Sequence, residues 1–107
     1  MGGEGPLTLH LFSSSAQPTV GIFIERFYDN ATRIPPDTSL YILTENDDRW
    51  EDITRQVLPE PFDPGLFYEF SPSSDSLTVR AYTTTKEGYI TEGNILHIWK
   101  WSGTCYK

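Results

Sequence analysis

Short runs in which apolar and polar residues alternate dominate this chain, and they predict β-strands. Leu7, Leu9 and Leu11 alternate with polar residues, which is the period of a strand with one buried face. β-Branched and aromatic residues, which strands prefer, dominate the other runs. The pattern predicts six strands, at Leu7–Leu11, Thr19–Tyr28, Leu40–Leu43, Leu66–Phe70, Leu77–Tyr82 and Ile95–Trp101.

The segments between these runs carry turn-forming residues. Pro, Asn, Asp, Ser and Gly cluster at 35–37, 46–48, 59–65, 71–75 and 87–88, and each of these residue types favours a turn conformation. The strands are therefore short and antiparallel, and the fold class is all-β. Trp99 lies between Ile98 and Lys100 on an apolar strand, which predicts a core position for its ring.

The segment Asp48–Leu58 fits two interpretations. Trp50, Ile53 and Val57 recur at helical spacing, and Pro59 would end such a helix. The same residues alternate passably as a strand after the Asn46–Asp48 turn. Because strands flank the segment on both sides, we favour the strand.

Composition narrows the functional classes. The 107 residues (12.2 kDa) form a single domain, 1–107, with 14% aromatic residues, too many for a disordered chain. No apolar run is long enough for a membrane span. A net charge of −7 and a pI near 4.6 exclude nucleic-acid binding, which needs positive charge. The start of the chain lacks the pattern of a secretory signal, which favours a cytoplasmic location.

The candidate catalytic and metal-binding groups are isolated along the sequence. His10 and His97 have no second ligand nearby, so we expect no metal and no cofactor. Cys105 is the single cysteine, which excludes a disulfide framework within the chain. It has no visible base beside it, which argues against a nucleophilic role. No arrangement of residues indicates a reaction, and we expect no catalytic residues and no enzymatic activity.

The chain shows signs of an internal duplication, over residues 7–58 and 66–107. Arg26-Phe27-Tyr28 corresponds to Arg80-Ala81-Tyr82, and Leu40–Leu43 corresponds to Leu96–Trp99. The spacing that aligns Leu40 with Leu96 also aligns Trp50 with Tyr106, so each half ends on a large aromatic residue. A repeat of about 55 residues has the size of a propeller blade. Two blades cannot close a ring alone, so this interpretation requires a homo-oligomer, for example a trimer.

These motifs resemble the six-bladed fucose-binding lectins, whose blades carry Arg-x-Tyr, Ile-x-Glu and Trp-polar-Gly-x-x-aromatic. The second half reads Arg80-Ala81-Tyr82, Ile90-Thr91-Glu92 and Trp101-Ser102-Gly103-Thr104-Cys105-Tyr106. The resemblance implies two propeller-blade-like repeats and a glycan partner, such as a fucosylated one. Glu92 lies nine residues before Trp101, whereas the glutamate and tryptophan of the family are closer together.

Sugar binding calls for an aromatic ring beneath the sugar and for charged groups on its hydroxyls. The residues of these types that we assign to the site are Arg26, Arg80, Glu92, Trp50, Trp101 and Tyr106. The sequence thus predicts a non-enzymatic, lectin-like protein. The alternatives are a β-sandwich module that docks a protein partner without a small-molecule ligand, and a small β-barrel.

Overall fold

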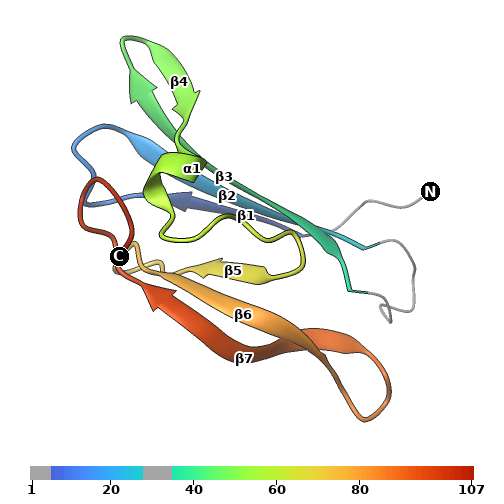
Figure 1. Ribbon diagram of the computed structural model, residues 1–107. Helices are drawn as coiled ribbons and strands as arrows, with labels where there is room; N and C mark the ends of the chain where they lie inside the picture. The colour runs from blue at the N-terminus through green and yellow to red at the C-terminus, as the bar shows by residue number, and fades with distance from the viewer. Residues whose placement is uncertain (1–5, 28–34) are drawn as a thin grey trace.

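Two antiparallel sheets make up the protein in a computed structural model that describes residues 6–27 and 35–107. The two sheets lie one above the other and do not close into a barrel (Figure 1). Tyr28, at the end of one predicted strand, lies outside the described residues. The all-β prediction is confirmed, and the two-sheet arrangement corresponds to the sandwich alternative.

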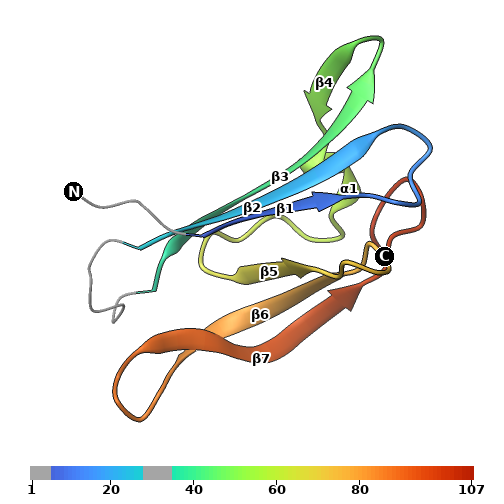
Figure 2. The same cartoon turned by 180° about the vertical axis from the view of Figure 1, so that it is seen from behind.

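The N-terminal half forms a four-stranded sheet in sequence order. Its strands are β1 (Leu7–Leu11), β2 (Thr19–Arg26), β3 (Asp37–Asn46) and β4 (Arg49–Asp52). The β3–β4 turn contains Asp47 and Asp48, both at positive φ (52° and 63°), a conformation that Asp tolerates better than most residues. This hairpin projects beyond the rest of the sheet (Figures 1 and 2).

The C-terminal half forms a three-stranded sheet, also in sequence order. Its strands are β5 (Phe67–Phe70), β6 (Leu77–Thr84) and β7 (Ile90–Trp99). The β6–β7 pairing is interrupted by register shifts on both sides of Arg80. Each candidate repeat therefore lies on its own sheet, although one sheet has four strands and the other three. The duplication itself stays a prediction.

The segment Asp48–Leu58 contains both a strand and a helical turn, the two structures that its sequence left open. Its first part is strand β4, and its second part is a single helical turn, α1 (Thr54–Val57). The favoured strand interpretation is thus confirmed as far as Asp52 and wrong for α1. The Thr54 hydroxyl accepts a hydrogen bond from the Ile42 amide (2.9 Å) and donates one to Asp52, which fixes the turn against β3. No helix in the described part of the chain is long and apolar enough to cross a membrane.

The core lies between the sheets and is rich in aromatic residues. Phe23 on β2 meets Phe67 edge to face, with ring centroids 5.3 Å apart. Gly21 lies directly beneath the Phe70 ring, which leaves no room for a Cβ there. The buried apolar side chains are Phe23, Leu40, Ile42, Val57, Tyr68, Phe70, Leu77, Val79, Trp99 and Tyr106. The core position predicted for Trp99 is confirmed.

Strand β1 directs its histidine, and not its leucines, toward the second sheet. His10 is buried against the second sheet, while Leu7, Leu9 and Leu11 are 60%, 59% and 69% exposed. The half-buried strand that the alternation predicts is therefore present, with the leucines on its exposed face. His10 takes the inner position because its ring stacks on Phe70 (5.2 Å between centroids) and its Nε2 lies 2.7 Å from Asp75.

Candidate functional site

The residues that resemble a lectin motif, Trp101 to Tyr106, form a tight loop after β7. Trp101 and Tyr106 pair as an isolated β-bridge. Between them, the Ser102 hydroxyl donates to the Cys105 carbonyl (2.9 Å) and accepts from the Cys105 amide (3.2 Å). Gly103 has a φ of 103°, which explains why glycine stands at this position. The spacing of the motif is therefore that of a closed turn.

The loop packs against the connection between β1 and β2 through three aromatic rings. Trp101 contacts Phe12 and Tyr106 edge to face, with centroids 4.8 Å and 4.9 Å away. The amide of Tyr106 donates to the Val57 carbonyl (2.9 Å), which ties the loop to α1 as well. Two of the six predicted site residues, Trp101 and Tyr106, are thus brought together by the fold.

Three buried polar atoms at this end of the sandwich have no hydrogen bond partner within residues 6–27 and 35–107. They are the Ser15 hydroxyl, the Trp101 indole Nε1 and the Tyr106 hydroxyl. Burial, and then the charge of Asp75, raise the pKa of Tyr106, so its hydroxyl keeps its proton. Buried polar groups normally have partners because an unpaired one costs about 1–3 kcal/mol. Ser15 and Trp101 line one hollow, and the Tyr106 ring packs against Trp101.

Two of these residues, Ser15 and Trp101, line a hollow of about 170 Å³. Most of the other described residues around it are small or carry hydroxyl groups; Ile53 and Gln17 are the exceptions. The whole lining is Ser15, Ala16, Gln17, Thr19, Thr44, Ile53, Trp101, Gly103 and Thr104. The hydroxyls of Thr19 and Thr44 lie 3.2 Å apart across β2 and β3. With one aromatic wall and several hydroxyl-bearing residues, this hollow is uncharged, and its exposed lining is mostly apolar.

Next to the hollow lies a Ser, His and Asp cluster that the sequence did not reveal. Asp75, 1% exposed, accepts hydrogen bonds from the amides and hydroxyls of Ser13 and Ser14, and lies 2.7 Å from His10 Nε2. Among the described residues no serine hydroxyl bonds to the histidine, which nucleophilic catalysis would require. The cluster therefore serves to join the turn before β6 to the β1–β2 connection.

Of the other predicted site residues, Arg26 and Glu92 lie toward the opposite end of the molecule, and Arg80 lies midway along β6. Arg80 donates to the Gly93 carbonyl (3.2 Å), and Glu92 pairs with Tyr82 across β6 and β7. Glu92 is seven residues before Trp99 at the end of β7, or about 23 Å along a strand. Arg26 lies at the end of β2, where it donates to the Ser39 hydroxyl (2.8 Å). These charges do not reach the hollow beside Trp101.

Trp50 stands alone among the predicted residues. It lies on β4 opposite Glu45, with 51% of its surface exposed. Arg26 pairs with Asp37, eight residues before Glu45 on β3, so about 26 Å of strand separates Trp50 from Arg26. The six predicted residues therefore do not form one site.

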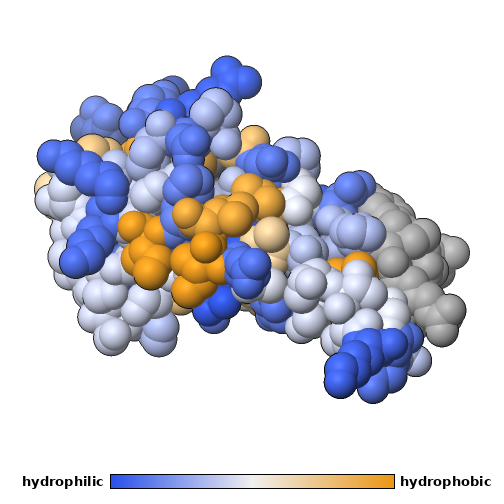
Figure 3. Space-filling view, turned by 60° about the horizontal axis from the view of Figure 1, so that its bottom comes forward, coloured by the Kyte–Doolittle hydropathy of each residue, from blue (hydrophilic) through white to orange (hydrophobic). Residues whose placement is uncertain are grey.

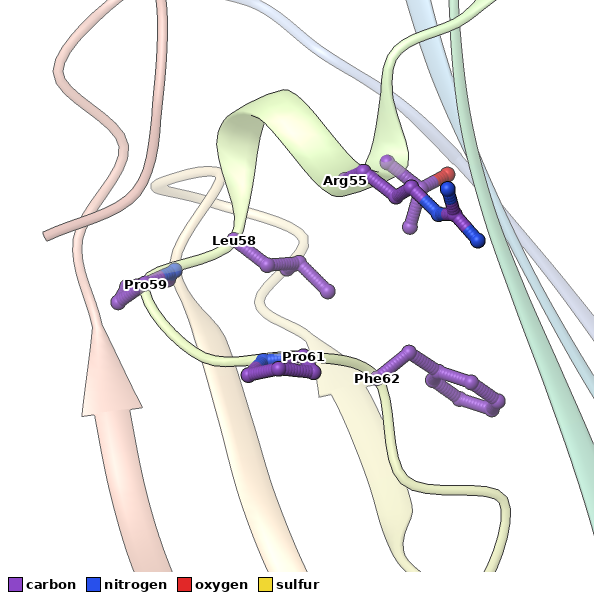
Figure 4. Close-up of a pocket in the computed structure, with 6 residues that line it drawn as sticks. Arg55, Leu58, Pro59, Pro61 and Phe62 are labelled. Atoms are coloured by element: carbon purple, nitrogen blue, oxygen red, sulfur yellow. The ribbon is translucent and has the colours of Figure 1, made fainter.

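A larger hollow, of about 580 Å³, lies between α1 and the loop that leads to β5. Figure 4 shows Arg55 on α1 and Phe62 on the loop on either side of it, with Leu58, Pro59 and Pro61 along the wall. Thr54, the remaining lining residue, uses its hydroxyl within the fold. Arg55 is the one charged residue of this lining, so the hollow offers an apolar wall and a single cation.

The described residues contain no group of three or more His, Cys, Asp or Glu side chains that could hold a metal ion. Comparison of the chain with family models, with curated proteins and with solved structures gives no match. The residues of the hollow that sequence reasoning missed, Ser15, Thr19 and Thr44, come from three separate segments of the chain. Their types are common in turns and strands, so no sequence signal distinguishes them.

Proposed function

We propose that this chain is a non-enzymatic carbohydrate-binding protein, with a small neutral sugar bound in the hollow beside Trp101. The observation that carries the proposal is the group of buried, unpartnered polar atoms of Ser15, Trp101 and Tyr106 at this end of the sandwich. A sugar presents an apolar face to an aromatic ring and hydroxyls to polar groups. The hydroxyls of Thr19, Thr44 and Thr104 add donors and acceptors around the same space.

The chemistry of the lining limits the ligand class. The described residues around the hollow carry no charge, which favours a neutral sugar over a sugar acid or phosphate. A volume of about 170 Å³ is below the range of roughly 300–1,000 Å³ that holds drug-sized ligands. The ligand is therefore a single sugar unit, such as the end of a glycan chain.

A titration followed by NMR tests this proposal. A panel of monosaccharides, including fucose, is added to the full chain while the indole N–H signals of Trp101 and Trp50 are recorded. We expect one sugar to shift the Trp101 signal and leave Trp50 unchanged. Trp101→Phe should abolish binding, whereas the matched variant Trp50→Phe should bind as the wild type does. A panel that leaves the Trp101 signal unmoved contradicts the proposal.

Ser15→Ala separates a binding role from a structural one. The Ser15 hydroxyl has no partner in the described structure, so its removal should not lower the free energy of unfolding. If the hydroxyl bonds to the sugar, the same variant should weaken binding about tenfold, which corresponds to one lost hydrogen bond. Unchanged sugar affinity in Ser15→Ala would remove this hydroxyl from the site.

A further inference from the structure

The edge of β3 that faces α1 has a gap in its main-chain hydrogen bonds at Leu40. On either side of the gap, the Thr38 amide donates to the Pro64 carbonyl (3.1 Å), and the Ile42 carbonyl accepts from the Ile53 amide (2.8 Å). Main-chain groups alternate in direction along a strand, so the amide and carbonyl of Leu40 point to this same edge. Neither group has a partner there within the described part of the chain.

Burial makes this gap costly while it stays empty. Leu40 is only 5% exposed, and buried main-chain groups are almost always paired, because an unpaired one loses its hydrogen bonds to water without replacement. The gap is one residue long, between the contact with α1 and the contact with the loop before β5. One residue of an extended chain, which offers an N–H and a C=O on one side, would fill it.

Two hollows adjoin at the gap. The smaller one, of about 310 Å³, is lined by Leu40, Asp52, Thr54, Arg55, Gln56 and Phe62. The larger one, of about 580 Å³, shares Thr54, Arg55 and Phe62 with it. In Figure 4 the side chains of Arg55 and Phe62 extend from α1 and from the loop toward β3. We call the two hollows together the α1 groove, which leads from the apolar wall to the edge of β3.

Tertiary contacts hold the loop wall of the α1 groove in place. The Asp63 amide donates to the Tyr68 hydroxyl (2.9 Å), and Glu60 lies 2.8 Å from His97 Nε2 on β7. The two prolines of the wall further restrict its backbone. A groove that is already shaped costs a ligand less ordering entropy than one that forms on binding.

The charges of the α1 groove favour an anion in its larger hollow. Arg55 has no ion pair and no hydrogen bond with any residue that the structure describes. Asp52 lines only the smaller hollow, and its Oδ1 accepts a hydrogen bond from the Thr54 amide (3.0 Å). Beside the apolar wall the guanidinium is therefore unmatched, and its planar fork fits the two oxygens of a carboxylate.

We propose that the α1 groove binds the C-terminal end of a partner polypeptide in an extended conformation, with an apolar last residue. The terminal carboxylate meets Arg55, and the last side chain lies against Leu58, Pro61 and Phe62. The preceding residue fills the gap, with its N–H donating to the Leu40 carbonyl and its C=O accepting from the Leu40 amide. A polypeptide end supplies the main-chain pair, the apolar side chain and the carboxylate together. The groove thus takes up the alternative expectation of a protein-docking module.

Fluorescence anisotropy with the full chain tests the carboxylate. The probes are fluorescein-labelled hexapeptides, Gly-Ser-Gly-Ser-Thr followed by Leu, Ile, Val or Phe, each made with a free C-terminal carboxylate and with a C-terminal amide. We expect at least one free-ended peptide to bind and its amide form to bind at least tenfold more weakly. Equal affinity for the two forms, or no binding by any of the four free-ended peptides, overturns the proposal.

Substitution of the arginine tests which cation is used. Arg55→Gln should weaken the free-ended peptide at least tenfold and leave the amide form unchanged. Arg49→Gln is the matched control, because Arg49 is exposed on β4 and lies outside both hollows, so it should bind as the wild type does. Unchanged affinity in Arg55→Gln, or an equal loss in both variants, contradicts the assigned role of Arg55.

A modified peptide tests the pairing at the edge of β3. Methylation of the threonine amide nitrogen removes the donor to the Leu40 carbonyl and should weaken binding about tenfold. In ¹H–¹⁵N spectra the unmodified peptide should shift the Leu40 amide proton downfield, as expected for a new hydrogen bond. A methylated peptide of unchanged affinity, or a Leu40 signal that does not move, overturns the pairing.

An apolar surface elsewhere controls for unspecific adhesion of the peptide. Ile95, Leu96 and Ile98 on β7 are 46–57% exposed, and Figure 3 shows a compact hydrophobic area with hydrophilic residues around it on this side of the molecule. Ile98→Ser should leave peptide binding unchanged, and loss of binding in this variant would overturn the proposal. The α1 groove shares no described lining residue with the hollow beside Trp101, so the peptide and sugar proposals can fail separately.

Discussion

The Nε2 atom of His10 lies 2.7 Å from Oδ1 of Asp75, and the two residues are 65 positions apart in the chain. Both side chains are buried, at 7% and 1% exposure. Asp75 also has a φ of 57°. In this conformation its carboxylate accepts hydrogen bonds from Ser13 and Ser14. This contact joins the two sheets at the end of the molecule that carries the hollow beside Trp101.

Asp75→Asn should strongly destabilise the fold. The substitution removes the charge that accepts hydrogen bonds from His10, Ser13 and Ser14, and an amide group cannot accept all of them. Disrupting a buried network of this kind costs about 3 kcal/mol. Urea unfolding measures the loss. Asp48→Asn is the matched control, because Asp48 also has a positive φ (63°) but lies exposed in the β3–β4 turn; an equal loss in both variants would contradict the role of the cluster.

The same carboxylate makes stability depend on pH in the acid range. Burial alone would raise the pKa of Asp75, but hydrogen bonds from Ser14, His10 and Ser13 outweigh it and lower the pKa from 3.8 to about 2. Because the folded pKa lies below the unfolded one, the stabilisation is complete above about pH 4 and is lost as the pH falls toward 2. The amount is about 2 kcal/mol.

Urea unfolding at several pH values measures this contribution. The difference in unfolding free energy between the wild type and Asp75→Asn should shrink by about 2 kcal/mol from pH 5 to pH 2. A difference that stays constant over this range would mean that Asp75 titrates normally in the folded protein.

The pKa of Glu25 is raised in the folded protein, whereas the pKa of Asp75 is lowered. Burial raises the pKa of Glu25, a hydrogen bond from Tyr82 (2.7 Å) lowers it, and the charge of Glu92 raises it. Tyr82→Phe should therefore raise the pKa of Glu25 further, and Glu92→Gln should lower it. NMR of the Glu25 side-chain carboxyl carbon measures the pKa of Glu25 in both variants. If the two substitutions shifted this pKa in the same direction, the assigned roles of Tyr82 and Glu92 would be contradicted.

The effect of Tyr82→Phe on the free energy of unfolding should depend on whether Glu25 is ionised. Loss of the hydrogen bond between Tyr82 and Glu25 should cost about 1 kcal/mol at pH 7. Because this hydrogen bond lowers the pKa of Glu25, it stabilises the carboxylate more than the protonated carboxyl, so the cost of the substitution should fall as the pH drops and Glu25 takes up a proton. Thermal unfolding at pH 7 and pH 4 compares the two conditions, and a larger loss at pH 4 would count against the mechanism.

Gly21→Ala should destabilise the protein because the new Cβ would lie within the Phe70 ring. Overpacking of this kind costs about 1–3 kcal/mol, which urea unfolding would detect. At Gly65 a Cβ would meet only the Asp63 carboxylate, at 3.2 Å, so Gly65→Ala is the control, with an expected change within about 0.5 kcal/mol. Phe70→Leu should recover part of the loss in the Gly21→Ala background; a stable Gly21→Ala variant would contradict the close packing.

The sequence by itself determined the strands and most of the turns. Strand β1 has the predicted bounds, and every other predicted strand overlaps an observed one. Alternation and β-branched residues act locally, through the pleat and the preferred backbone angles, so they can be read without the tertiary structure. For Asp48–Leu58 the sequence left a helix and a strand open, and the helical turn α1 depends on a tertiary contact, between the Thr54 hydroxyl and the Ile42 amide.

Only the tertiary structure decided which face of each strand is buried and which predicted site residues meet. Alternation along β1 marks two faces, but it does not say which one meets the second sheet. His10 faces inward because it contacts Asp75 and Phe70 on that side, and the leucines then point to the solvent. Trp101 and Tyr106 come together through the last loop, while the length of the strands separates Glu92 from Trp101 and Arg26 from Trp50. Contacts between residues far apart in the chain follow from packing, and a pattern of period two carries no information about them.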